Sequence, residues 1–218
     1  EEGFGSLPFY FFNMITSSDL GLNITTGYGK LFLKTAPSTT PVSLAEAKTH
    51  LRVTGTDDDT YITTLIDVAT QTAEEFLNLK LMSQTWVLYL DEFPDYFDLL
   101  IGTLKTASIG GIKYYNDSNV LTTLADSNYF IDEFHRPARV YFADDATIPD
   151  TFDRPNAVAV EFTLGYSTAS NVPAPIRQAI LLMIGTYYEI RQDVITGTIV
   201  SEIPKTSEFL LRQYRIQQ

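Results

Sequence analysis

Two histidines, His50 and His135, are the only imidazole side chains in this sequence that could act as catalytic bases. A Ser-His-Asp site would have to use one of them, and neither lies near the glycine pattern that surrounds an exposed nucleophilic serine. The sequence contains no cysteine, which excludes thiolate nucleophiles, disulfides and sulfur-ligated zinc. We therefore predict no catalytic residue and expect that the protein is not an enzyme.

Acidic side chains cluster at two places. Asp57, Asp58 and Asp59 could offer oxygen ligands to Ca²⁺ or Mg²⁺, but they lack the spaced ligands and terminal glutamate of a calcium loop. Acids at the start of a helix are stabilised by its dipole, so helix capping is the favoured interpretation and a metal site the alternative. Asp144 and Asp145 lie in a polar loop and are interpreted as a solvated turn. The glycines of IGG (109–111) are not followed by the Lys-Ser/Thr of a phosphate loop. We therefore expect no metal and no cofactor.

Aromatic side chains on predicted strands could stack on sugars or on single-stranded bases. They are Trp86, Tyr114, Tyr115, Tyr129 and Tyr141. Because side chains alternate between the two faces of a strand, about half of them are expected in the core. A carbohydrate-binding or hydrolytic β module stays open as an alternative, and it requires several of these rings to share one exposed face.

The composition limits the possible partners. The chain has 218 residues, 44% of them hydrophobic, which can fill a substantial core. Its 27 acids and 15 bases give a formal net charge of −12, which disfavours a protein that grips duplex DNA. The longest apolar runs, LPFYFFNMI (7–15) and AILLMIG (179–185), are too short to span a bilayer, so no membrane association is expected. The absence of cysteine fits a reducing compartment or an assembly that is built inside a cell.

Three helical segments are expected to position these residues. Ser43 and Glu46 form a capping box that begins a helix over about 44–52. Apolar residues at spacings of three and four predict a long second helix over about 58–78, and the short link between the two favours an antiparallel hairpin. A third helix, over about 175–193, is apolar nearly all round and is expected to be buried centrally.

Between the second and third helices the hydrophobic period changes to two. Roughly six short strands are predicted over 84–166, separated by turn-rich NDSN, HRPA and DRPN, which is typical of antiparallel hairpins in a small sheet or sandwich. One further short strand is expected at 30–34. The stretch Phe9 to Phe12 is too apolar to stay in water, so it is expected to cover either its own domain or a partner chain. The predicted fold class is α+β, a helical bundle with an inserted antiparallel β domain and extended N- and C-terminal arms.

Three sequence segments, called here the family words, resemble those of a known family. They are PVSLAEAKTHLRV (41–53), SQTWVLYLDEFP (83–94) and FTLGYSTASNVPAPIRQAILLMIGTYYEIRQDV (162–194), with a weaker fourth, FLLRQYRI, near the C-terminus. In this order they resemble the head-tail connector (adaptor) proteins of long-tailed bacteriophages and gene-transfer particles. The resemblance covers most of 33–216. Residues 1–28 match nothing in that family.

The resemblance implies a structural virion protein of the neck. Copies of such proteins form a ring, typically of twelve, that joins the portal protein of the capsid to the stopper or tail-completion protein, and double-stranded DNA passes through without specific binding. Residues 1–40 show no helical period and are interpreted as an N-terminal arm. Combined with the predicted elements, the resemblance divides the rest of the chain into a helical hairpin (41–80), an inserted β domain (81–170), a central helix (171–194) and a portal-docking tail (195–218). A stopper or tail-completion protein is the alternative from the same particle.

The resemblance and the chemistry of the side chains together suggest three sets of site residues. Apolar groups dominate interface energies, so the expected portal-docking anchors are Phe209, Leu210, Leu211 and Tyr214. Arg191 and Arg212 lie in the family words and are expected at subunit interfaces. An acidic channel wall would repel DNA and not hold it, and the candidates for that wall are Asp57, Asp58, Asp59, Asp144 and Asp145.

Overall fold

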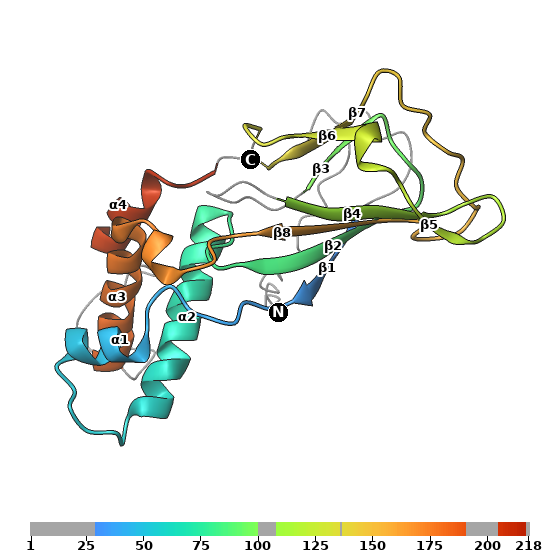
Figure 1. The fold of residues 1–218 in the computed structure, drawn as a ribbon. Helices are drawn as coiled ribbons and strands as arrows, with labels where there is room; N and C mark the ends of the chain where they lie inside the picture. The colour runs from blue at the N-terminus through green and yellow to red at the C-terminus, as the bar shows by residue number, and fades with distance from the viewer. Residues whose placement is uncertain (1–28, 100–107, 136, 191–204, 217–218) are drawn as a thin grey trace, which may run out of the picture.

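The fold has a helical part and a β part, each with its own hydrophobic core (Figure 1). It is known from a computed structural model that describes residues 29–99, 108–135, 137–190 and 205–216. The helices lie side by side at one end of the molecule and the two sheets lie at the other. The predicted α+β class and the antiparallel sheets are confirmed.

The helical part contains α1 (Leu44–Leu51), α2 (Asp59–Leu77), α3 (Ala174–Glu189) and α4 (Lys205–Arg212). The predicted capping box begins α1: the Ser43 hydroxyl accepts from the Glu46 amide, and the Glu46 carboxylate accepts from the Ser43 amide. The helices α2 and α3 each contact all the other helices described, and α3 packs mainly against α2 and α4. Its buried residues, Ile176, Ala179, Ile180, Met183 and Ile184, recur at spacings of three and four. None of the helices in the described ranges is long and apolar enough to cross a membrane.

The β part is a sandwich of two antiparallel sheets. Its strands in chain order are β1 (Lys30–Thr35), β2 (Gln84–Leu90), β3 (Tyr96–Asp98), β4 (Ser108–Tyr115), β5 (Leu121–Thr123), β6 (Tyr129–Asp132), β7 (Arg139–Phe142) and β8 (Val158–Leu164). One sheet has the order β1-β2-β8-β4-β5 and the other β3-β7-β6. Alternate residues of β8, at 158, 160, 162 and 164, are buried between the sheets. The described chain thus has seven strands over 84–166, where about six were expected.

The two parts meet where β2 and β8 approach the helices. The amide of Tyr166 donates to the Leu81 carbonyl oxygen at 2.7 Å, and the amide of Ser83 donates to the Tyr166 carbonyl oxygen at 2.8 Å. Gly165, directly before Tyr166, has a φ of +91°, and a Cβ there would come within 2.3 Å of the carbonyl oxygen of Met82. The close backbone approach that joins the two parts therefore requires glycine.

Three predicted boundaries change. The strand expected at 30–34 exists as β1, but it pairs with β2 along its length, so this part of the expected N-terminal arm belongs to the sheet. The helix α3 ends at Glu189 and not at 193. Residues 205–216 are not an extended arm, because the apolar face of α4 packs against the helical core. The aromatic stretch Phe9 to Phe12 and residues 195–204 lie outside the described residues.

Candidate functional site

Polar contacts connect α1, α2 and α3 around the helical core. Arg177 on α3 forms an ion pair with Glu46 on α1, and Lys48 on α1 lies 2.5 Å from Asp59 on α2. Hydrogen bonds from the Ser43 backbone and side chain, followed by the charge of Arg177, lower the pKa of Glu46. These bonds join the neighbouring helices α1 and α2 to each other and join α1 to α3, which is remote in the sequence.

The acids at the start of α2 fall into two environments. Asp58 is the N-cap residue of α2, but its side chain makes no capping hydrogen bond and instead accepts one from the Tyr188 hydroxyl of α3. Asp59 lies in the first turn, as the dipole interpretation expects, and pairs with Lys48. Of the three proposed channel-lining acids here, only Asp57 is exposed. The other two therefore contribute to joining the helices of this chain.

The second acidic pair lies in the β part. Asp144 and Asp145 are exposed in a turn that follows β7, closed by a 2.9 Å hydrogen bond from the Ala146 amide to the Ala143 carbonyl oxygen. The polar turn predicted from the sequence is thus present. Because Asp57 is in the helical part, the structure does not bring the two sets of candidate channel acids together.

The four proposed docking residues differ in burial. Leu211 is fully buried in the helical core, and Leu210 and Tyr214 are half-buried against it. Phe209 is 78% exposed on the opposite side of α4. Leu211 therefore stabilises this chain, and Phe209 is the one of the four that offers a free apolar side chain. The two proposed interface arginines differ similarly, since Arg212 is exposed on α4 and Arg191 lies outside the described residues.

The five aromatic residues singled out from the sequence do not share one exposed face. Trp86, Tyr114 and Tyr129 pack into the core between the sheets. Tyr115 lies on the outer face of the five-stranded sheet, where the Arg154 guanidinium lies 3.9 Å from its ring centroid. Tyr141 lies on the three-stranded sheet, which is the other layer of the sandwich. The requirement of a sugar-binding module is therefore not met by these five rings.

A different aromatic row was missed by the sequence analysis. Tyr96, Tyr141 and Phe130 are directly paired across β3, β7 and β6. The Phe130 and Tyr141 rings are stacked with centroids 5.6 Å apart, and Tyr96 and Tyr141 are 5.9 Å apart. Alternation along each strand could have placed these rings on one face of their own strand, but not opposite one another, because that depends on strand register.

The two histidines lie in different parts of the fold, one on a helix and the other beside the ion pair of Asp98 and Arg139. His50 is exposed in the last turn of α1. The Nδ1 atom of His135 lies 2.7 Å from the carbonyl oxygen of Pro137 and 3.9 Å from Asp98 Oδ1. Asp98 is only 7% exposed and accepts two hydrogen bonds from Arg139, at 2.6 and 3.0 Å, which raise the pKa of that guanidinium. Within the described ranges no three His, Asp or Glu residues are grouped as a metal ion would require.

Comparison with known proteins places these features in context. Residues 41–134 match the family model of the phage gp6-like head-tail connector proteins. This segment covers α1, α2 and the strands from β2 to β6. A comparison with curated proteins finds no match.

The fold is similar to chains in three solved structures of gene transfer agent (GTA) particles. A chain in the neck of an empty particle, computed with C6 symmetry, is 24% identical with a TM-score of 0.69, covering 87% of this chain and 96% of that chain. A chain in the virion of a native particle is 24% identical with a TM-score of 0.68, covering 86% and 96%. A chain in the neck of a native particle, computed with C12 symmetry, is 22% identical with a TM-score of 0.68, covering 87% and 96%. The predicted resemblance to head-tail connector proteins is therefore confirmed over residues 41–134, and most of the chain shares its fold with chains of GTA particles.

Proposed function

We propose that this chain is a structural virion protein that forms a ring in the neck of a phage or phage-like particle, between the portal protein and the stopper or tail-completion protein. The observation that carries the proposal is the agreement of two independent similarities. The connector family pattern covers 41–134, and the fold of GTA particle chains covers 87% of the chain. Both point to the same position in a particle, and assembly would take place in the host cytoplasm.

A ring of about twelve copies is part of the proposal. The solved GTA necks were computed with C6 and with C12 symmetry, and twelve copies are compatible with both. Phe209 and Arg212 on α4 are the exposed residues of the C-terminal segment that we assign to contacts with the portal and with neighbouring copies. An exposed phenyl ring supplies apolar area that a partner can bury, and an arginine supplies directed hydrogen bonds.

We further propose that DNA passes through the ring without specific binding. The chain carries a formal net charge of −12, so a ring of copies repels the phosphate backbone wherever its acids face the channel. Asp57, Asp144 and Asp145 are exposed and are the acids assigned to this wall. In this function the chain acts by binding and needs no catalytic residue.

Mass photometry of the purified chain, alone and mixed with the portal protein of the same particle, followed by electron microscopy, tests the proposal. The expected result is one ring of copies at one end of the portal. Deleting residues 195–218 is unsuitable, because it would also uncover the core around Leu211. Phe209→Asp is the sharper variant, and Phe134→Asp is its control, since Phe134 is 97% exposed in the β part.

The proposal predicts that Phe209→Asp abolishes the portal complex and that Phe134→Asp does not. A chain that stays a monomer beside the portal at all ionic strengths contradicts the adaptor assignment. Binding only to a preassembled portal and adaptor complex would instead identify a stopper or tail-completion protein.

A further inference from the structure

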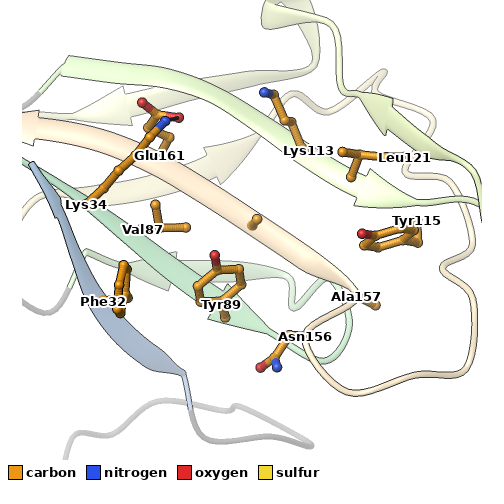
Figure 2. A pocket seen from close by; sticks show the side chains of 11 residues that line it. Phe32, Lys34, Val87, Tyr89, Lys113, Tyr115, Leu121, Asn156, Ala157 and Glu161 are labelled. Atoms are coloured by element: carbon orange, nitrogen blue, oxygen red, sulfur yellow. Dashed lines mark hydrogen bonds and ion pairs between the residues drawn. The ribbon is translucent and has the colours of Figure 1, made fainter.

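The outer face of the five-stranded sheet carries a shallow groove of about 320 Å³ (Figure 2). Side chains from β1, β2, β4, β5 and β8 line it. Its apolar part consists of Phe32, Val87, Tyr89, Leu121, Ala157 and Ala159. The groove thus extends across the sheet from one edge strand to the other.

This face has no covering layer among the described residues. The three-stranded sheet covers the opposite face, where Leu88, Val160 and Phe162 are buried. On the groove side, Phe32 is 61% exposed and Leu121 is 52% exposed, although both belong to strands of the sheet. A long edge strand with an exposed phenyl ring is a surface that proteins normally cover.

The rim of the groove is basic although the chain as a whole is acidic. Lys34 and Lys113 line it, and Lys30 lies beside it with its Nζ atom 3.5 Å from Asn156 Oδ1. Two acids are present against these three lysines: Glu161 is paired with Lys34 at 2.6 Å, and Asp91 accepts a hydrogen bond from the Asn156 amide. The net charge of the rim is therefore positive, so an apolar segment with acidic flanks would complement it.

The segment that precedes β1 has this composition. Residues 1–28 contain three acids, Glu1, Glu2 and Asp19, and no lysine or arginine. They also contain the apolar stretch LPFYFFNMI at 7–15. The segment leads into β1, which carries Phe32 at one end of the groove. The 14 residues from 16 to 29 that separate the stretch from β1 can span up to about 50 Å when extended, so the stretch can fold back over the sheet.

We propose that residues 7–15 of this chain's own N-terminal segment dock in this groove, with the rings of Phe9 to Phe12 against the apolar floor and the acids of the segment facing the lysine rim. The groove explains how a strongly apolar stretch is removed from water, and the stretch explains why the outer face of the sheet is apolar. Attachment to β1 gives the segment a high effective concentration at its own groove, which favours it over the same segment of another copy. This inference concerns the isolated chain and does not depend on the proposed ring.

Because the chain contains no cysteine, cysteine pairs can test the docking without background. The test variant carries Phe11→Cys and Leu121→Cys, and the control carries Phe11→Cys and Phe130→Cys, since Phe130 lies on the other sheet. Each is treated with a short thiol-to-thiol crosslinker at several protein concentrations. Products are separated on a denaturing gel and identified by mass spectrometry of their peptides.

The expected result is an intramolecular crosslink in the groove pair, with a yield that does not change with protein concentration, and severalfold less in the control pair. A covalent dimer whose yield rises with concentration overturns the proposal and assigns the groove to a second copy. Equal yields in both pairs, or no product in the groove pair, overturn it as well, because the segment then has no preferred position.

A charge-reversal variant adds a second readout. Lys113→Glu in the groove pair should reduce the crosslink yield severalfold, and Arg212→Glu on α4 should leave it unchanged, since both side chains are exposed and only the first is at the rim. Circular dichroism verifies that each variant is folded. An unchanged yield in folded Lys113→Glu protein contradicts the electrostatic part of the proposal.

Discussion

The backbone amide of Ile216 donates a hydrogen bond to the carbonyl oxygen of Leu77, 3.1 Å away, and thereby joins the C-terminal segment to the end of α2. The Asn78 side chain adds a second bond, at 3.2 Å, to the Ile216 carbonyl oxygen. Residues 205–216 are therefore part of the helical core as well as the proposed source of partner contacts. The two roles belong to different faces of α4, so they can be separated by mutation.

Leu211→Ala is expected to lower the free energy of unfolding by about 2–5 kcal/mol, because it removes a fully buried side chain and leaves a cavity. Phe209→Ala, two residues earlier, should change it by less than about 0.5 kcal/mol, because the ring is 78% exposed. Urea denaturation measures both. Equal effects would mean that Phe209 also supports the fold.

Arg212→Glu is expected to weaken ring assembly with little change in the stability of the monomer. Its only ion pair among the described residues is with Glu208, at 3.9 Å and exposed to solvent, which contributes little. Mass photometry with the portal protein measures assembly, and thermal unfolding measures stability. A parallel loss of both would assign Arg212 to the fold and not to an interface. The same comparison applies to Arg191→Glu.

The stability contributed by Glu46 should depend on pH in the acid range. Its pKa is lowered from the ordinary value of 4.5, chiefly by the Ser43 hydrogen bonds, so the folded state favours the ionised form. The contribution is therefore present above the unfolded-state pKa and is lost as the pH falls through the lower folded-state value. The stability difference between the wild type and Glu46→Gln should be constant near neutral pH and shrink below about pH 4.5. Glu75→Gln, an exposed site on α2, is the control, and urea titrations at several pH values measure the difference.

Ser43→Ala tests the other half of the capping box. Removing the hydroxyl that accepts from the Glu46 amide should lower the free energy of unfolding by about 1 kcal/mol. It should also raise the pKa of Glu46 in part, since the bond from the Ser43 backbone amide, the largest cause of the lowering, stays and the bond from the Ser43 hydroxyl is lost. A variant with unchanged stability would contradict the assignment of the helix start.

Arg139→Met is expected to destabilise the β part by about 3–5 kcal/mol, because it leaves the Asp98 carboxylate buried without its main partner. The double variant Asp98→Asn with Arg139→Met should lose less than the sum of the single variants. Chemical denaturation of all four proteins gives the coupling energy. Additive effects would show that the ion pair does not support the sheet.

Gly165→Ala is expected to lower the free energy of unfolding by at least about 2 kcal/mol, because a left-handed backbone conformation already costs an L-residue about 1–2 kcal/mol and the added Cβ would also clash with Met82. Gly55→Ala is the matched control, since a Cβ there meets nothing within 4 Å. Thermal unfolding compares the two. A neutral Gly165→Ala variant would show that the joint between the two parts can relax.

The local features of this protein were predictable from its sequence. The capping box of Ser43 and Glu46 begins a helix through contacts only three residues apart, and the alternation in β8 identifies its buried face. The connector words at 41–53 and 83–94 lie within the segment that matches the family model. Each of these depends on neighbours along the chain, so each can be interpreted without knowledge of the fold.

Only the tertiary structure decided which distant residues meet. The Tyr188 hydroxyl donates a hydrogen bond to Asp58, which is 130 positions away in the sequence. The packing of α4 buries Leu211 in the core and leaves Phe209 exposed. Strand register aligns Tyr96 with Tyr141 and Phe130. Similarly, the groove exists because β1 pairs with β2, which no local pattern in either strand specifies. Register and helix packing arise from the summed contacts of segments that are remote in sequence, so the composition of each segment leaves them undetermined.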